Sequence, residues 1–319
     1  MHWFLFLIFL SHLEIIFKPY YHISYSLIVK AKTTGKIEPW AVYSIHKLTP
    51  KEIENEKILK TIFSKKQSCE KTLSYGEILN LLPSQYRNIS PSEKEIILIF
   101  GNFNKYAVEK KITKIIKITE NNKEKKTKFK IKRIKLKNPI YKIVRKNKID
   151  NKIEILIPLE QQSENFVYYE ITAKLLEKLT KEKIKSDLIF TNLYVFLKIT
   201  IKGKKIKEKF ENLLKTMRKI KKGDIKEEIL KNAIEKAEFE NETKFETFED
   251  WAIYLTVKKL YEYPYKEPSF REIKIKNAKK KIKKISKKFF KHNNLILYAI
   301  LKNEEKFFIN SDFLEEYLK

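Results

Sequence analysis

The sequence predicts an α+β fold in which antiparallel or mixed sheets are covered by helices. Three observations lead to this prediction. The stretch Glu95–Ile118 passes from a short apolar run through a Gly-Asn turn into apolar residues spaced as one face of a helix. Aliphatic residues recur at every second position from Leu193 to Ile201, as they do on the buried face of a strand. Residues 204–290 have a helical pattern almost throughout and lead into an apolar run at 294–301, which predicts a terminal strand.

The composition indicates a folded and strongly basic chain. Its 319 residues are 43% hydrophobic and include 21 Phe and 17 Tyr, enough to fill a sizeable core. The net charge of +29 favours nucleic acid or an anionic membrane surface as a partner. However, only five of the 69 basic residues are Arg, whereas base recognition and bidentate phosphate binding favour Arg. Codon bias in an AT-rich genome is therefore a second explanation of the charge.

Residues 1–12 leave two interpretations open. The apolar run from Trp3 to Leu10 has the length of a signal peptide's hydrophobic segment, but no Lys or Arg precedes it. The same run fits an extension of a first strand, and it is too short to span a bilayer. Cys69 is the only cysteine, which excludes an intrachain disulfide and a thiolate metal cluster. The sequence predicts no transmembrane span and does not decide between a cytoplasmic and a periplasmic location.

Strand and helix signals in the first part of the chain alternate. Two β-rich runs within 13–32 predict two strands that pair with each other. Residues 49–52, Thr-Pro-Lys-Glu, form a capping box with Pro at the first helical position, and they predict a helix as far as Phe63. A second cap of this type at 74–77 predicts a helix that Pro83 must end.

The second part begins after 121–128, a segment without an apolar residue that we interpret as a linker. The later helices are separated by clear end signals, of which Gly223 followed by Asp224 and Glu227 is the sharpest. In chain order, the patterns predict strands at 129–136, 140–145, 153–157 and 193–201, helices that begin near 163, 206, 224, 248 and 277, a strand at 294–301 and a short helix from Ser311.

Three stretches resemble parts of the M16 zinc peptidase family, the insulinase and mitochondrial-processing-peptidase type. Residues 13–39 are similar to the opening hairpin of a family repeat. Residues 97–116 resemble the strand, turn and helix that close it, with Asn102 and Asn104 in place of acidic residues, and 204–290 resemble the helical part of the second repeat. The resemblance implies two α+β repeats, each an antiparallel or mixed sheet with helices packed on one face, the first repeat being truncated.

On this basis we expect the chain to divide into four parts. They are a signal segment or first-strand extension at 1–12, a truncated first α+β repeat at 13–120, a basic linker and strand at 121–137, and a second α+β repeat at 138–319.

The family's chemistry needs the inverted zinc motif His-x-x-Glu-His on one helix. This spacing places two imidazole ligands on one face and lets the Glu act as base on the metal-bound water. The sequence contains no such motif, and after Glu38 it passes directly to the cap at Thr49, as though the motif helix were deleted. We predict no catalytic residue, no metal ligand and no cofactor, although the resemblance implies zinc. The five histidines form no ligand pair on a predicted helix: His2, His12, His22, His46 and His292.

The resemblance also implies an Arg and a Tyr that hold the substrate backbone, between the first helix and the long hairpin of the second repeat. The corresponding stretch here, 179–190, offers Lys183 or Lys185 and Phe190. These three are the candidate peptide-contact positions. They depart from the family pattern, because a Lys can donate to a carbonyl but a Phe has no hydroxyl to donate.

Other common chemistries lack their motifs. The sequence has no Gly-rich phosphate-binding loop and no Gly-x-Ser-x-Gly elbow, and Cys69 has no His nearby in the sequence.

Two hypotheses from different classes follow. The first is a non-catalytic M16 peptidase-like protein that serves as scaffold or partner subunit of an active M16 zinc peptidase, with a bound peptide segment as a further partner. The alternative is a Lys-rich basic module that binds nucleic acid or an anionic membrane surface, which a steep salt dependence of binding would reveal. A third hypothesis, an active peptidase with other ligands, has no residue to support it.

Overall fold

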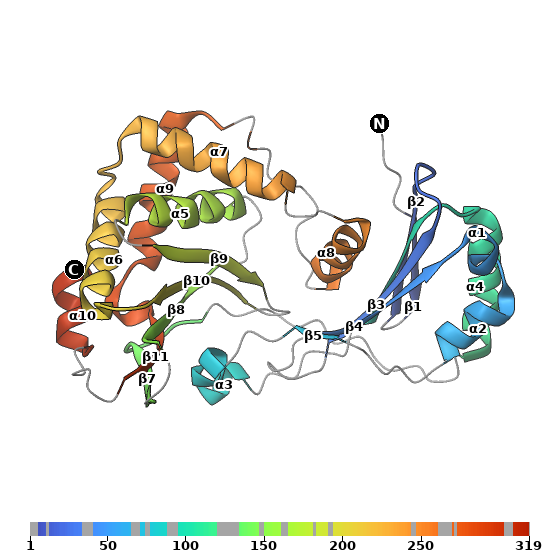
Figure 1. Ribbon diagram of the computed structural model, residues 1–319, viewed down its shortest axis with the longest axis horizontal. Helices are drawn as coiled ribbons and strands as arrows, with labels where there is room; N and C mark the ends of the chain where they lie inside the picture. Colours follow the sequence, from blue (N-terminus) through green and yellow to red (C-terminus); the bar gives the residue numbers. More distant parts are fainter. Residues whose placement is uncertain are drawn as a thin grey trace. The chain divides into compact units, whose positions relative to one another are not determined.

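The chain folds into two compact units, and each unit combines three separate stretches of sequence. The structure is a computed structural model (Figure 1). It describes residues 6–10, 13–33, 41–64, 71–73, 77–87, 95–119, 134–146, 150–160, 165–180, 183–190, 194–243, 247–260, 270, 273–302 and 309–318. Unit 1 comprises Met1–Ser74, Asn88–Lys130 and Phe245–Tyr263, and unit 2 comprises Tyr75–Arg87, Ile131–Lys244 and Pro264–Lys319.

Unit 1 contains a six-stranded sheet in the order β1-β2-β6-β3-β4-β5. Strand β6 is parallel to β2 and antiparallel to β3, so it lies between the two strands that the sequence predicts in 13–32. Both strands form, but the prediction that they pair with each other is wrong, because a largely apolar strand from later in the chain inserts between them. The strands are β1 Phe6–Leu10, β2 Leu13–Pro19, β3 Ser26–Thr33, β4 Ala41–Leu48, β5 Lys71–Leu73 and β6 Glu95–Gly101.

Three helices cover one face of this sheet: α1 Pro50–Ile53, α2 Glu56–Ser64 and α4 Lys105–Thr119. Thr49 forms the predicted capping box with Glu52, whose carboxylate accepts from the Thr49 backbone N–H at 2.7 Å. The single helix predicted as far as Phe63 is interrupted, since the Asn55 side chain accepts from the Lys57 N–H at 2.9 Å and starts α2 anew. These helices and the sheet enclose one buried cluster: Ile15, Phe17, Ile28, Ile53, Leu59, Ile62, Ile97, Ile99, Phe103, Val108, Ile112 and Ile115.

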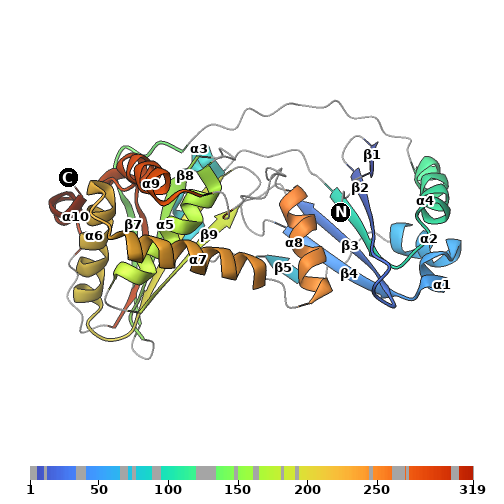
Figure 2. The same cartoon turned by 90° about the horizontal axis from the view of Figure 1, so that it is seen from above.

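Helix α8, Phe248–Leu260, covers the opposite face of the unit 1 sheet although it comes from the later part of the chain (Figures 1 and 2). The buried Phe100 ring of β6 meets the Trp251 ring edge to face, with centroids 5.3 Å apart. The Lys18 ammonium lies 3.7 Å from the centre of the same indole. At the rim, the Glu249 carboxylate pairs with Lys47 at 3.4 Å.

Unit 2 contains a five-stranded mixed sheet in the order β7-β11-β8-β10-β9. Strand β11 is parallel to β7 and antiparallel to β8, which in turn is antiparallel to β10. The strands are β7 Ile140–Arg145, β8 Lys152–Leu159, β9 Ile184–Phe190, β10 Val195–Lys202 and β11 Ile296–Leu301. The sequence patterns predict all of these except β9.

The two sheets share one connectivity. In unit 1 the last strand, β6, inserts between β2 and β3, and in unit 2 the last strand, β11, inserts between β7 and β8. Each inserted strand is parallel to the earlier of its neighbours and antiparallel to the later one. They differ in their edge strands and in one connection, since unit 1 has the edge strands β1 and β5. In unit 2 the chain forms α5 and the edge strand β9 before it returns to β10, whereas in unit 1 only residues 34–40 join β3 to β4. Seven residues cannot hold such a helix and strand, so the first repeat is truncated here.

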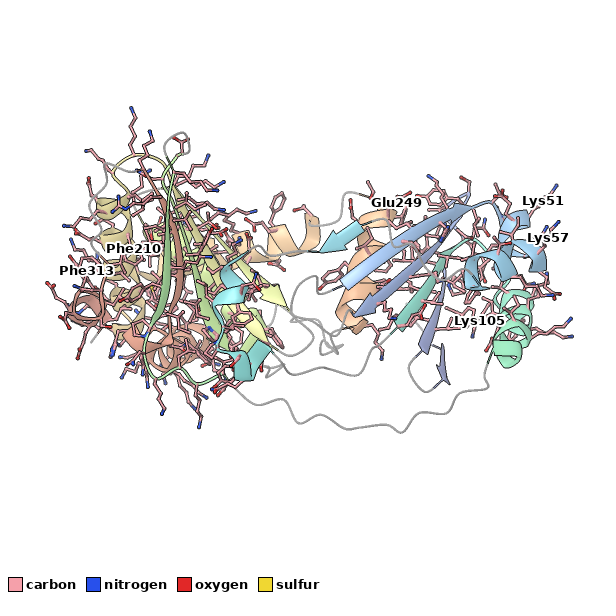
Figure 3. All side chains as sticks on the ribbon, turned by 90° about the horizontal axis from the view of Figure 1, so that it is seen from below. Lys51, Lys57, Lys105, Phe210, Glu249 and Phe313 are labelled. Carbon is pink, nitrogen blue, oxygen red and sulfur yellow. The ribbon has the colours of Figure 1, made fainter. Side chains whose placement is uncertain are left out.

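Five helices of unit 2 pack on its sheet and on one another: α5 Phe166–Leu179, α6 Ile206–Lys222, α7 Glu227–Thr243, α9 Ile275–Phe289 and α10 Ser311–Leu318. Gly223 ends α6 as predicted, with φ +79°. Asp224 is not the N-cap of α7, because α7 begins at Glu227. The Asp224 N–H donates to the Lys219 carbonyl and so belongs to the end of α6. Phe210 of α6 stacks on Phe313 of α10 with ring centroids 6.2 Å apart; both are labelled in Figure 3.

The segment 77–87 also belongs to unit 2. The helix predicted before Pro83 is a 3-10 helix, η1 Glu77–Leu81, followed by a short helix α3 at Ser84–Arg87. Buried side chains of η1 lie against β7, β8 and β11, and tertiary packing thus replaces the expected α-helix by a tighter turn. The cap at 74–76, the linker 121–128 and most of the strand predicted at 129–136 lie outside the described residues. Residues 134–136 of that strand are described and are not in a strand.

The predicted α+β class with two mixed sheets is confirmed. No helix within the described ranges is long and apolar enough to cross a membrane.

Candidate functional site

The candidate peptide-contact positions lie on and beside β9, an edge strand of the unit 2 sheet. Lys183 precedes the strand and is exposed. The Lys185 side chain is 77% exposed, and its ammonium lies 3.4 Å from the Asp187 carboxylate. Phe190 is the last residue of β9 and is opposite Val195; its side chain is outside the described part of the chain. The sequence patterns do not predict that this segment is a strand.

Ser186, in the middle of β9, anchors the strand to helix α5. Its hydroxyl donates to the Ala173 carbonyl at 2.6 Å, and its backbone N–H donates to Glu177 Oε1 at 2.8 Å. Since this N–H points to α5, it cannot take part in the ladder with β10, and the same holds for the N–H groups two residues away on either side. The side chain of Lys185 consequently points to the sheet face opposite α5.

Four charged side chains join α5 to α7 above the strand. Lys174 and Glu177 come from α5, Lys236 and Glu240 from α7, and each ammonium contacts both carboxylates. The distances to Glu177 are 3.6 Å from Lys174 and 2.6 Å from Lys236, and those to Glu240 are 2.6 Å and 3.5 Å. Lys174 and Glu177 are nearly buried, with side chains 10% and 11% exposed. We call these four residues the α5–α7 ion cluster.

The cluster sets the charge states of its own members. Burial by itself raises the pKa of Glu177, but hydrogen bonds from Lys236 and from the Ser186 amide, with the charge of Lys174, hold that pKa below its ordinary value. Burial lowers the pKa of Lys236, and the Glu177 and Glu240 carboxylates outweigh it and raise that pKa. Both groups therefore stay charged at neutral pH.

A cavity of about 310 Å³ opens between α5, α7 and β9. Its charged side chains are Glu170, Lys174 and Glu240, and Leu188 of β9 forms part of its wall. Asp187 contributes through its backbone, because its carboxylate pairs with Lys185 on the other sheet face. The Ser186 hydroxyl in this wall donates to a backbone carbonyl, and no described histidine lies beside it to activate it as a nucleophile. The Ser186 hydroxyl is therefore used to hold β9 against α5.

Sequence patterns alone did not identify the ion cluster. The pairs 174/177 and 236/240 have helical spacing that suggests contacts within a helix. The contacts between the two helices depend on how α5 packs against α7, and this packing cannot be predicted from a local sequence pattern.

The zinc that the family resemblance implies does not fit the residues present. No group of three His, Cys, Asp or Glu side chains in the described ranges could hold a metal ion. The described histidines are separate: His22 lies in the turn after β2, His46 on β4 and His292 in the 3-10 helix η4, His292–Asn294. Moreover, the described part of unit 1 has no helix at the position that α5 occupies in unit 2. The donor set for the family's metal is therefore missing from the described residues.

Comparison with known proteins identifies the fold. Neither a protein-family model nor a curated protein matches the sequence. Solved structures do match. A protease from Helicobacter pylori has 12% identity and a TM-score of 0.65, with 93% of this chain and 99% of that chain covered. An inactive M16 peptidase domain from Pseudomonas fluorescens has 6% identity and a TM-score of 0.66, with 96% and 100% covered. A chain of complex III2 from Candida albicans has 10% identity and a TM-score of 0.66, with 98% and 99% covered. The chain therefore has the fold of M16-like peptidases over nearly its whole length.

Proposed function

We propose that this chain is a non-catalytic M16-like protein that acts as scaffold or partner subunit of an active M16 zinc peptidase. The observation that carries the proposal is an M16-like fold spanning nearly the whole chain while the sequence has no His-x-x-Glu-His motif. Two of the similar structures support this proposal. One is an inactive M16 domain, which matches a non-catalytic role, and the other is a chain of complex III2, which matches a role as partner subunit. Transfer from these chains to this one is an argument by analogy of fold.

The truncation in unit 1 fits this role. A catalytic repeat needs a helix that carries the zinc ligands, and the connection 34–40 leaves no room for one at the position corresponding to α5. The sheet and its core remain closed without that helix, because α1, α2 and α4 cover one face and α8 the other. The scaffold thus survives the loss of the metal-binding element.

The edge strand β9 is the place where we expect a peptide segment to be held. The backbone N–H of Leu188 points away from β10, as that of Ser186 does, and no described residue accepts from it. An extended segment can add to such an edge through main-chain hydrogen bonds. Lys183 and Lys185 then supply exposed ammonium groups next to it, and Phe190 lies at the end of the same strand.

The partner claim is tested by co-purification from the source cells. The tagged full-length chain is isolated, and the proteins that co-purify with it are identified by mass spectrometry. The complex is then reconstituted from purified components. The expected companion is a chain with an intact His-x-x-Glu-His motif, in a fixed stoichiometry. Recovery of this chain alone, with stoichiometric zinc and peptide cleavage of its own, would contradict the proposal.

A further inference from the structure

Helix α9 concentrates positive charge in a way that the rest of unit 2 does not. Its 15 residues include eight Lys and no acidic residue. The adjacent helix α6 carries six Lys and one Arg against two Glu, whereas α7 has six Glu and two Lys. Codon bias alone would spread Lys evenly over these helices. The segregation of charge therefore calls for another cause.

The lysines of α9 are ordered along its exposed side. Lys276, Lys280, Lys283 and Lys287 recur at intervals of three or four residues, which places them in one straight row about 16 Å long. All four are exposed, and none forms an ion pair with a described residue. We call these four residues the α9 lysine row. The opposite side of the helix is buried through Ala278, Ile282, Ile285, Ser286 and Phe289.

The end of α6 extends this basic surface. The aliphatic part of the Lys283 side chain lies over Gly223, where a Cβ would be only 2.9 Å from its Cδ atom. Lys221 is near both Lys291 and Arg218, and its pKa is lowered by burial and by those two charges. Several cations therefore gather at this end of α6, next to Lys283 of the row.

We propose that the α9 lysine row, with the C-terminal end of α6, binds the sugar-phosphate backbone of a nucleic acid duplex. Successive lysines of the row are about 4.5 to 6 Å apart along the axis, so several can reach phosphates of one strand together. Lysines act as point charges without base recognition, so binding is independent of sequence.

Other polyanionic partners fit this surface less well. Insertion into a membrane would need the apolar side of α9, which is buried in the core of unit 2. Electrostatic adsorption to anionic lipid needs no insertion, and the vesicle measurement below detects it. An acidic protein would need an apolar or aromatic anchor in the interface. The large hydrophobic side chains that are exposed in the described ranges, Tyr21, Tyr106, Tyr141 and Phe239, lie outside α6 and α9.

Fluorescence anisotropy with a labelled random-sequence DNA duplex tests the inference on the full-length chain. The row variant carries Lys276→Gln, Lys280→Gln, Lys283→Gln and Lys287→Gln. A control variant of equal net charge carries Lys51→Gln, Lys57→Gln, Lys110→Gln and Lys137→Gln, all at exposed positions; Lys51 and Lys57 are labelled in Figure 3. Circular dichroism shows whether both variants remain folded, as Gln is a good helix former at solvated sites.

We expect the unaltered chain to bind the duplex with an affinity that falls steeply between about 50 and 200 mM salt. The row variant should bind at least about tenfold more weakly at 100 mM salt, with a log–log salt slope reduced by about 3 to 4. The control variant should lose less than about threefold. Equal losses in both variants would overturn the inference, because total charge and not the row would then determine binding. Absence of duplex binding at 50 mM salt, or binding only to vesicles that contain phosphatidylserine, would also overturn it.

Discussion

The carboxylate of Glu177 on α5 accepts a hydrogen bond from the backbone N–H of Ser186 on β9 at 2.8 Å, with the carboxylate nearly buried. The same carboxylate contacts Lys174 and Lys236. One side chain thus satisfies the outward N–H of an edge strand and joins two helices through the α5–α7 ion cluster. An edge strand that is bonded in this way is open to a further strand only on either side of the anchor.

Replacement of Glu177 by Ala should destabilise unit 2 by about 2 to 3 kcal/mol, because it leaves the Ser186 N–H unbonded and removes a carboxylate from two neighbouring ammonium groups. The measurement is urea unfolding followed by circular dichroism, since all three Trp residues belong to unit 1 and their fluorescence does not report on unit 2. The matched control is Glu235→Ala, which removes an exposed pair with Lys231 and should cost less than about 0.5 kcal/mol. Equal losses for the two variants would show that the cluster has no special role.

Acidification should weaken unit 2 through its buried carboxylates. Burial by itself raises the pKa of Glu154, but hydrogen bonds and charges from Lys198 and Lys152 hold it below its ordinary value of 4.5, and Glu177 is lowered likewise. The unfolded chain then binds more protons than the folded one near pH 4. Stability should therefore be complete above about pH 5 and fall as the pH drops through the lower folded pKa values. Urea midpoints between pH 7 and pH 3.5 measure this loss.

The matching variant is Glu154→Gln, which cannot titrate. Its stability should be lower at neutral pH and should decline less on acidification than that of the unaltered chain. An unchanged pH dependence in this variant would mean that other groups control the acid response.

The contact between α8 and the unit 1 sheet should be a major source of that unit's stability. The Phe100 ring is fully buried against Phe248 and Trp251. Phe100→Ala should cost about 3 to 4 kcal/mol and should shift the tryptophan emission to longer wavelength in the folded state. Tyr106→Ala is the control at a position that is 80% exposed, and should change stability by less than about 0.5 kcal/mol. Chemical unfolding followed by fluorescence separates the two outcomes.

Gly101 should tolerate no side chain. Its φ is +125°, and a Cβ would lie 2.5 Å from the Tyr25 carbonyl oxygen and 2.7 Å from the Ser26 Cα, both in the backbone. Gly101→Ala should therefore cost at least about 3 kcal/mol or prevent folding of unit 1. Gly203→Ala has only backbone strain to overcome, at φ +98° with a flexible Lys209 end 3.3 Å away, and should cost about 1 to 2 kcal/mol. Thermal unfolding of the two variants measures both losses of stability. A larger loss for Gly203→Ala than for Gly101→Ala would contradict the prediction.

The expected peptide edge at β9 has its own test. Leu188→Pro removes the outward N–H without removing a ladder bond to β10, because edge strands accept Pro where the N–H faces solvent. It should abolish binding of an extended peptide, whereas Leu188→Val should preserve it. Isothermal titration with peptides recovered from the co-purified complex measures both, and equal binding by the two variants would exclude the edge of β9 as the site.

Local signals in the sequence were sufficient where one short segment decides the structure. The capping box at Thr49 and the left-handed Gly223 at the end of α6 depend on neighbours within a few residues, and both are confirmed. The closing turn after β6 also forms locally, with the Asn104 side chain accepting from the Ala107 N–H at 3.2 Å in the position of the family's acidic residue. Such features can be predicted from the sequence because the residues that cause them lie next to one another in the chain.

Features that depend on distant partners were missed. Strand β9 was overlooked because Ser186 stands where an apolar residue would complete the alternation, and it does so to bond with Ala173 on α5. The insertion of β6 between β2 and β3 and the placement of α8 on the first sheet join segments far apart in sequence. The ion cluster was missed for the same reason, since helical spacing fixes its members within α5 and α7 but not across them.

Hydrolysis of a quenched fluorescent peptide tests the central claim most directly. The assay compares this chain alone, an M16 peptidase with an intact zinc motif from the same cells alone, and the two mixed. A non-catalytic partner should show no cleavage alone and should raise the rate of the mixture above that of the peptidase alone. Cleavage by this chain alone that a zinc chelator abolishes would contradict the claim.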